Sequence, residues 1–290
     1  MNIETVKLSG SLDIGKIEEI LQVGMEIITC KKELIVDLSE VTFVRPISLV
    51  VFAATIYNAR TLGNKLKVVL PNKMDTRSYI NSIGFQSFLE GNQKEPSYYK
   101  SYVPLYHLDA NRPQFVDLLI DFIQREGVDN KTSYIIRLGI NELIQNVFDH
   151  SKSQVGCFVC SQSYRQKKYI RTAMVDLGIG IPTNARTISR FKNSTDDRIL
   201  LAATNGEITT RHNIPGAKGL KMLCEIITEN QGNICIFSHK GRFTGEGSKK
   251  NAKLKEVFFQ GTGIEFKLPY LFDDEKSVGF GFKEIIEGEI

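Results

Sequence analysis

The first third of the chain alternates between short apolar runs and segments with a single apolar face. The run ELIVDL, at 33–38, is almost wholly apolar, which is typical of a strand buried on both faces of a parallel sheet. Pro46 suits the first turn of a helix, and Gly63 suits its end. The predicted elements are strands at 3–10, 33–38 and 64–71 and helices at 11–28, 46–62 and 76–85. This order predicts a small α/β sheet with helices packed on it.

A polar stretch that contains Gly91 and Pro96 interrupts this pattern and has the composition of a loop. Beyond it, the pattern predicts a strand at 102–108 and helices at 113–127 and 131–150. A chain of 290 residues is long enough for two domains, and we expect the α/β (α+β) class. The expected parts are a small α/β domain at 1–95, a linker and first strand at 96–112, an α/β sandwich with a mixed sheet covered by helices at 113–270, and a tail at 271–290.

At residues 141–151 the chain reads NELIQNVFDHS, in which polar side chains interrupt an otherwise apolar helical segment. At about 100° per residue, Glu142 and Asn146 lie one turn apart, and Asp149 and His150 fall in the same third of the circumference. The apolar residues of the segment occupy the opposite side and can face a core. The polar stripe therefore faces either water or a ligand, and His150 is equally well a structural histidine.

Two glycine-containing strand ends follow this helix. TAMVDLGIGIP, at 172–182, ends a strand in Asp176 and adds Gly178 and Gly180, which leave the backbone free to approach a ligand. Further on, FFQGTGIEFKLP sets Thr262 between two glycines. Taken one at a time, these segments are equally well plain turns.

A third glycine-containing segment, IPGAKGLKMLCEII, begins an apolar helix with Gly216 and Gly219. Exposed N–H groups at a helix start, with Lys218 beside them, suit the binding of phosphate, although such glycines also occur in ordinary loops. The polar segment at 187–215 precedes it and contains a short helix pattern at DDRILLAAT. Arg211 and Lys218 are either phosphate ligands or solvated charges.

The order of these motifs resembles the GHKL family of ATP-binding domains, which includes those of gyrase, histidine kinases and the anti-sigma-factor serine kinases. The resemblance implies ATP and Mg²⁺ as cofactors, with Asn146 as a metal ligand, Glu142 as the catalytic carboxylate, and Asp176 as the acceptor of the adenine amino group. It also implies a mobile lid over 187–215. The other implied nucleotide-binding residues are Asp149, Gly178, Gly180, Gly216, Lys218, Gly219, Leu220 and Thr262.

The first domain resembles the STAS domains of bacterial anti-sigma-factor antagonists, through the order of its elements and the stretch VDLSEVTFVRPISLVVFAATIYNAR. Those antagonists carry a DSSG turn in which a serine accepts phosphate from a partner kinase. The matching positions here are Arg45, Pro46, Ile47 and Ser48, so neither serine is kept, and Ser48 stands where the family has glycine. The resemblance therefore favours a docking or dimerising module, with Ser48 as the nearest hydroxyl if phosphate is accepted there.

Composition and charge bear on location and partners. We expect a cytoplasmic protein, because no run approaches the length of a membrane span and the N-terminus lacks the features of a signal peptide. A net charge of +4, spread along the chain, argues against nucleic-acid binding. The basic run at 239–256 predicts either a long solvated hairpin or a surface for a protein partner. Cys157 and Cys160 have CxxC spacing, which favours two buried thiols in a strand over a metal or redox site.

Three classes of function fit these motifs. The first is a protein serine/threonine kinase of the anti-sigma-factor type, acting on a STAS-type or sigma-regulatory protein. The second is an ATPase switch without phosphotransfer, and the third is an interaction protein that binds ATP without turnover. A histidine kinase is disfavoured, because no helical hairpin with a phosphoacceptor histidine precedes the ATP-binding motifs. We also expect either a homo-oligomer or an intramolecular contact of the STAS-like domain.

Overall fold

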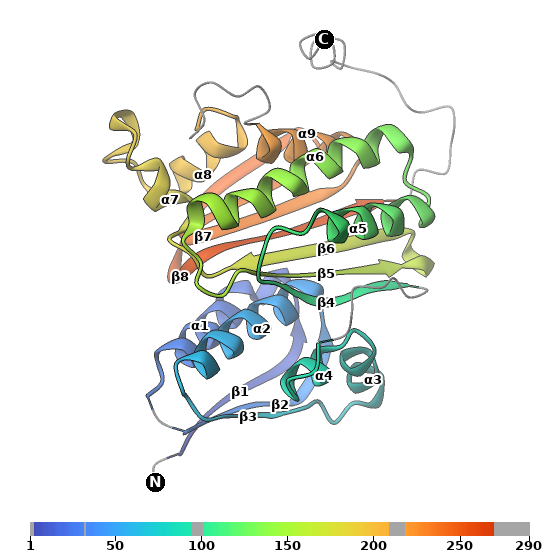
Figure 1. Ribbon diagram of the computed structural model, residues 1–290, viewed down its shortest axis with the longest axis vertical. Coiled ribbons are helices and arrows are strands. Elements are labelled where there is room, and N and C mark those ends of the chain that lie inside the picture. Colours follow the sequence, from blue (N-terminus) through green and yellow to red (C-terminus); the bar gives the residue numbers. More distant parts are fainter. Residues whose placement is uncertain (1–2, 32, 94–100, 209–217, 270–290) are drawn as a thin grey trace.

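The computed structural model describes residues 3–31, 33–93, 101–208 and 218–269 and stacks them in alternating layers of helices and sheets (Figure 1). The predicted domain boundary falls within the undescribed residues 94–100, and the predicted tail also lies outside the described part of the chain.

The N-terminal part forms a three-stranded sheet of order β1-β2-β3, in which both pairs of strands run parallel. Parallel neighbours need crossover connections, which α1 and α2 provide. The elements are β1 (Ile3–Leu12), η1 (Ile14–Lys16), α1 (Ile17–Thr29), β2 (Glu33–Val44), α2 (Pro46–Thr61), β3 (Leu66–Val69), α3 (Met74–Ser82) and α4 (Phe85–Leu89). The predicted alternation of strands and helices is confirmed. The helix predicted at 76–85 is divided at Gly84, because its φ of +88° ends the helical path.

The C-terminal part forms a five-stranded sheet of order β4-β5-β6-β8-β7. Its elements are β4 (Tyr102–Leu108), α5 (Pro113–Arg125), α6 (Asn130–Asn146), η2 (Val147–Ser151), β5 (Cys157–Tyr164), η3 (Arg165–Lys167), β6 (Tyr169–Asp176), α7 (Gly180–Ala185), η4 (Ser189–Phe191), α8 (Asp196–Thr204), α9 (Gly219–Glu229), β7 (Asn233–Glu246) and β8 (Lys249–Pro269). Every neighbouring pair is antiparallel, so the expectation of a mixed sheet is wrong. The connections from β5 to β6 and from β7 to β8 are too short for a parallel crossover.

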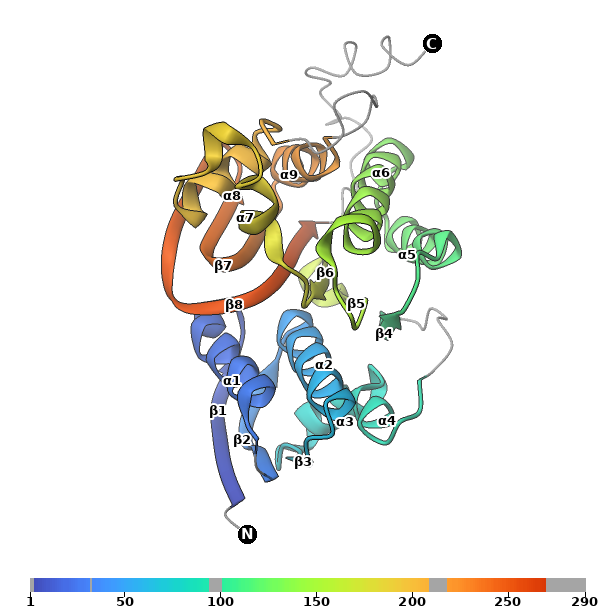
Figure 2. The same cartoon turned by 60° about the vertical axis from the view of Figure 1, so that its left-hand side comes forward.

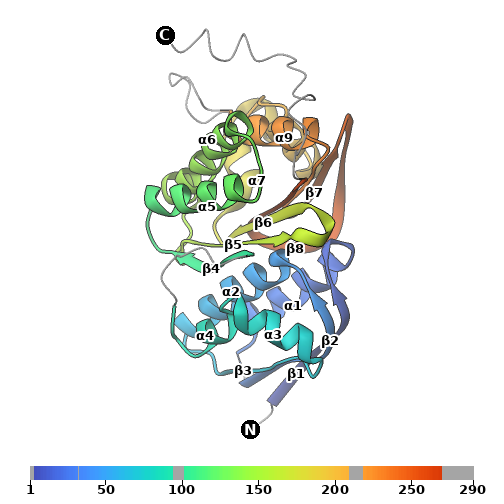
Figure 3. The same cartoon turned by 90° about the vertical axis from the view of Figure 1, so that its right-hand side faces the viewer.

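The five-stranded sheet is covered on both faces (Figure 3). Helices α5, α6 and α9 lie on one face, and α1 and α2 lie on the other. Alternate side chains of β6 serve the two cores, because Ile170 packs in the core beneath α6 while Ala173 and Val175 pack in the core shared with α2. Strand β8 curves strongly between β7 and α1 (Figure 2).

Helix α2 is apolar on all sides, which is the composition of a helix without a solvent face. It lies between the two sheets and contacts β3 on one side and β5 and β6 on the other. Val36 and Val50 of the N-terminal part share one core with Phe158 and Val175 of the C-terminal part. The two parts are therefore joined by continuous apolar packing. Among the described residues, no helix combines the length and the apolar composition needed to cross a membrane.

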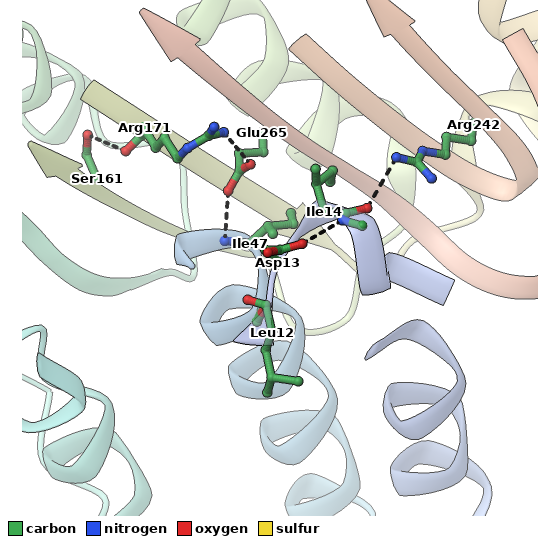
Figure 4. Close-up of polar contacts among 10 residues, drawn as sticks. Leu12, Asp13, Ile14, Ile47, Ser161, Arg171, Arg242 and Glu265 are labelled. Carbon is green, nitrogen blue, oxygen red and sulfur yellow. Dashed lines mark hydrogen bonds and ion pairs between the residues drawn. The ribbon is translucent and has the colours of Figure 1, made fainter. Parts of the chain in front are cut away.

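A buried polar contact lies at the start of α2, where Glu265 of β8 faces the helix N-terminus (Figure 4). One Glu265 carboxylate oxygen accepts the Ile47 N–H at 3.4 Å, and the other pairs with Arg171 at 2.9 Å. The side chains of Glu265 and Arg171 are 2% and 8% exposed. Ser48 is fully buried, and its hydroxyl donates to the Leu12 carbonyl at 2.9 Å. A phosphate donor therefore does not reach Ser48 while this packing is intact.

Replacing Arg171 with Met should destabilise the protein, because the Glu265 carboxylate then stays buried without its guanidinium partner. We expect the free energy of unfolding, measured by urea titration, to fall by about 3–5 kcal/mol. The double variant Arg171→Met/Glu265→Leu should recover most of this loss, since apolar side chains replace both charges. Arg137→Met, at an ion pair with exposed Asp117, is the control and should cost under about 1 kcal/mol. If Arg171→Met and Arg137→Met lowered the free energy of unfolding equally, this result would contradict the importance of the buried pair.

Candidate functional site

The polar stripe predicted from NELIQNVFDHS lies on α6 and its continuation. The Asp129 side chain caps α6 by accepting the Thr132 N–H at 2.9 Å. After Asn146 the helix continues as the π-helical turn η2, a local widening that is often found at functional sites. Glu142 and Asn146 are half-buried and Asp149 is exposed. Apolar residues spaced about one turn apart on α6 enter the core. The amphipathic arrangement predicted for this segment is confirmed.

Glu142 contacts the start of α9. Its carboxylate Oε2 accepts the backbone N–H of Gly219 at 2.6 Å. An anionic oxygen is favourable at this place, because the first N–H groups of a helix have no partner within the helix. A Cβ at Gly219 would lie 2.7 Å from the Cβ of Glu142, and one at Gly139 would lie 2.9 Å from the Cβ of Leu223. Glycine at both positions therefore allows α6 and α9 to approach closely.

Asp176, the last residue of β6, lies opposite Thr262, which is inside the long strand β8. Asp176 is only 4% exposed, and one of its carboxylate oxygens accepts the Gly178 N–H at 2.7 Å. The backbone N–H of Thr262 donates to the same carboxylate. Gly261 has a φ of +100°, and a Cβ there would lie 2.0 Å from the Asp176 carbonyl oxygen. Glycine at 261 is therefore needed for β8 to pass the strand end that carries the carboxylate.

The end of α6 and the end of β6 are joined by direct hydrogen bonds. The Ile179 N–H donates to the Ser151 carbonyl at 2.6 Å, and the Asn184 amide donates to the His150 carbonyl at 3.3 Å. A Cβ at Gly178 would lie 2.2 Å from the Ser151 carbonyl oxygen. The helix that carries Glu142 and Asn146 thus ends against the strand tip that carries Asp176.

Two of the glycines predicted to pass beside a base instead pack against protein. Gly178 fits against Ser151, and Gly180, with a φ of +74°, lies where a Cβ would be 2.7 Å from the Ser238 hydroxyl and 2.8 Å from His239. The Ser238 hydroxyl also donates to the Gly261 carbonyl at 2.6 Å. Neither Ser151 nor Ser238 could be identified as a site residue from the sequence, because their partners lie on distant segments.

Burial raises the pKa of Asp176 to about 7. The N–H groups of Gly178 and Thr262 oppose this rise by donating to the charged form. The Ser151 hydroxyl lies within reach of the same carboxylate, and its single hydrogen can also go to the Val147 carbonyl at 2.7 Å. Asp176 therefore gains and loses a proton near neutral pH, a property typical of functional sites.

The other predicted contacts surround the start of α9 and the segment before it. Lys218 is exposed directly before α9, and Leu220 is half-buried in its first turn. Gly216 and Arg211 lie outside the described residues. The helix predicted at DDRILLAAT is confirmed as α8, which packs with α7 and η4 around Phe191 and Ile199. The described part of the predicted lid is thus built on its own small core.

The basic run at 239–256 lies in the long antiparallel pair of β7 and β8, so the predicted hairpin is confirmed. It is not solvated throughout, because Lys255 is 3% exposed and its ammonium donates to the carbonyls of His239 and Val257. Burial lowers the pKa of Lys255 to about 8. Cys157 and Cys160 are free and buried in β5, as predicted, and burial raises the pKa of both thiols.

The residues around this corner suit a nucleotide with a divalent ion. The Asn146 amide oxygen is a hard ligand of the kind that Mg²⁺ accepts, and the Gly219 N–H already donates to an anionic oxygen of Glu142. The described residues hold no group of three or more histidine, cysteine, aspartate or glutamate side chains arranged for a metal ion. A Mg²⁺ ion at Asn146 would therefore take most of its ligands from phosphate and water.

No model of a known protein family matches this chain, and no curated protein matches it either.

Replacing Asp176 with Asn should change the dependence of stability on pH. The folded pKa of about 7 lies above the ordinary value of 3.8, so the folded state binds the proton more tightly than the unfolded state. The free energy of unfolding of the wild type therefore falls as the pH rises from about 4 to about 7. The carboxamide stays neutral and keeps an acceptor oxygen, so the variant should lose this fall. At pH 8 it should be more stable than the wild type by on the order of 3 kcal/mol.

This difference can be measured by urea unfolding at pH 4, 6 and 8. Asp121→Asn, at an exposed position on α5, is the control for the removal of one carboxylate. If Asp176→Asn showed the same dependence of the free energy of unfolding on pH as the wild type, this result would contradict the raised pKa of Asp176.

Proposed function

We propose that this protein is an Mg-ATP-binding regulator whose nucleotide site lies between α6, the start of α9, the end of β6 and the paired part of β8. The observation that carries the proposal is the meeting of distant motifs at one corner of the second sheet. Glu142 contacts Gly219, Asp176 pairs across strands with Thr262, and Ser151 joins the end of α6 to the end of β6. The order of the motifs resembles the GHKL domains of anti-sigma-factor serine kinases, and we assign the protein to that type.

The proposed adenine contact is Asp176. A carboxylate offers about four lone-pair positions, of which the N–H groups of Gly178 and Thr262 use two. A remaining position can accept a hydrogen bond from the adenine amino group. The deprotonated carboxylate, which predominates above the pKa of about 7, cannot donate to the guanine carbonyl, so the site favours adenine in this pH range. Thr262, on the neighbouring strand, adds a hydroxyl beside this contact.

The proposed phosphate contacts are the N–H groups at the start of α9, together with Lys218. The bound nucleotide with its Mg²⁺ supplies the transferable phosphate. Asn146 would hold the ion, and the exposed Asp149, three residues further along the chain, would be a second polar contact for the nucleotide. Both the phosphates and Glu142 need the N–H of Gly219, so nucleotide binding would release the carboxylate from this hydrogen bond. Glu142 would then be in a position to orient or deprotonate the attacking group.

The N-terminal part is proposed to be a STAS-like docking module. Its α1 and α2 pack on the second sheet, and Ser48, the nearest counterpart of a phosphoacceptor, is fully buried. A protein substrate is therefore proposed to lie on another chain, such as a STAS-type or sigma-regulatory protein.

One observation also favours an ATPase switch without phosphotransfer. The Glu142 to Gly219 hydrogen bond couples the proposed catalytic carboxylate to the position of α9. Bound phosphate would break this hydrogen bond, and the bond would form again after hydrolysis. Helices α6 and α9 would thus switch between two arrangements. The two functions share one site and differ in whether the phosphate acceptor is a protein hydroxyl or water.

Nucleotide binding can be tested by calorimetry with ATP and GTP, in the presence and absence of Mg²⁺. The wild type should bind ATP in preference to GTP. Asp176→Asn should bind ATP about ten- to a hundredfold more weakly and lose the preference, because a carboxamide can donate to the guanine carbonyl. Asn146→Ala should make ATP affinity independent of Mg²⁺, and the exposed Asn81→Ala is its control. Absence of ATP binding by the wild type would rule out the proposed site.

Turnover can be tested with γ-labelled ATP, by following both free phosphate and label on purified STAS-domain proteins. Glu142→Gln should slow either reaction by about a hundredfold or more, because it removes the general base, while ATP affinity changes little. Glu229→Gln, at the exposed end of α9, is the matched control. Labelled protein would identify a kinase, and free phosphate alone would identify an ATPase. Unchanged turnover in Glu142→Gln would exclude the proposed role of Glu142.

A further inference from the structure

A cavity lies between the N-terminal part and the second sheet, on the face opposite to α6. Its volume is about 310 Å³. Ile14 and Arg45 line it from the N-terminal part, and Arg171 and Arg242 line it from β6 and β7 (Figure 4 shows three of these side chains). Arg171 is separated from Asp176 by five residues of strand, about 16 Å, and its side chain lies on the other face of the sheet. The cavity is therefore distinct from the proposed nucleotide site.

The cavity wall carries an excess of positive charge. Arg45, Arg171, Arg242 and Lys249 line it, against the two carboxylates of Glu246 and Glu265. The Glu265 carboxylate pairs with Arg171, accepts the Ile47 N–H and also attracts Arg45. The nearby Asp13 carboxylate attracts Arg45 and Arg171 as well, so the positive excess of the wall rests mainly on Arg242 and Lys249. A cavity with this balance attracts an anion.

Two guanidinium groups at this cavity have unused donors. The Nε atoms of Arg171 and Arg242 are buried and have no hydrogen-bond partner in the described part of the chain. Other guanidinium contacts hold each arginine: Arg171 pairs with Glu265, and Arg242 donates to the Ile14 carbonyl at 3.2 Å and has a side-chain hydrogen bond with Cys235. The side chain of Arg171 is only 8% exposed, so its unused donor lacks the hydration that a surface group has. A buried donor without an acceptor is costly, and an anionic oxygen in the cavity would satisfy it.

We propose that this cavity binds a small organic phosphate. Guanidinium groups bind phosphate oxygens with paired N–H donors, and three arginines line this cavity. The remaining wall includes the neutral polar side chains of Asn233, Thr244 and Asn251, which suit a hydroxyl-bearing body the size of a sugar. The volume exceeds what a single phosphate group needs and reaches the lower end of ordinary ligand sites.

Binding at this place bridges the two parts of the chain. Arg45 directly precedes α2, whereas Arg171 and Arg242 belong to the second sheet. A ligand held by all three stabilises the packed arrangement and is lost when the parts separate. The occupied cavity would thus act as an effector site that holds the N-terminal part against the sheet.

The proposal can be tested on the full chain by calorimetry with inorganic phosphate, ribose 5-phosphate and ribose, at an ionic strength held constant with chloride. Arg45→Gln and Arg242→Gln should each weaken phosphate binding by about tenfold or more, through the loss of charge-assisted hydrogen bonds. Arg60→Gln, at the exposed far end of α2, removes the same charge and should bind as the wild type. Ribose should not bind.

The outcomes separate the sources of phosphate and the two sites. Tighter binding of ribose 5-phosphate identifies an organic phosphate, and equal binding identifies free phosphate, with the same arginines responsible. Asn146→Ala should bind both compounds as the wild type does, since it lies at the other site. Absence of binding to the wild type, or binding that neither Arg45→Gln nor Arg242→Gln weakens, would overturn the proposal. Thermal denaturation of each variant without ligand checks that the arginine substitutions leave the fold intact.

Discussion

The burial of the five-stranded sheet on both faces is the constraint on which the rest of the structure depends. Its central strands, β6 and β8, must supply apolar side chains to the core beneath α6 and also to the core shared with α2. A charged group in these strands is costly unless it is paired or hydrogen-bonded. Asp176 meets this requirement with backbone N–H groups, and Glu265 meets it with Arg171 and the start of α2. Burial of either carboxylate is therefore costly, and each carboxylate depends on its hydrogen-bond partners.

The proposed function follows from the competition for one N–H group. Glu142 holds the start of α9 through Gly219, at the place where a nucleotide phosphate would bind. We propose that a ligand that takes this N–H changes the contact between α6 and α9 and makes the carboxylate available for chemistry. The same event would thus prepare catalysis and alter the shape of the site. On the opposite face, the arginine-lined cavity offers an independent way to favour the packed arrangement of the two parts.

Much of this arrangement could be predicted from the sequence, because local patterns determine it. The alternating elements of the N-terminal part and the helix α8 lie where periodicity predicted them, and the stripe with Glu142 and Asn146 is on one side of α6. The direction of the strands in the second sheet was predicted wrongly, because strand pairing depends on contacts that periodicity does not encode. The packing partners of Gly178 and Gly180, the bridging hydroxyls of Ser151 and Ser238, and the cavity between the parts all depend on residues far apart in the chain.

The most direct test of the central claim is a crystal structure of the protein with Mg²⁺ and a non-hydrolysable ATP analogue. The account predicts that the adenine amino nitrogen lies about 3 Å from a carboxylate oxygen of Asp176. It further predicts that Asn146 contacts the ion and that Glu142 no longer accepts the Gly219 N–H. A nucleotide bound elsewhere, or one whose base does not contact Asp176, would contradict the account.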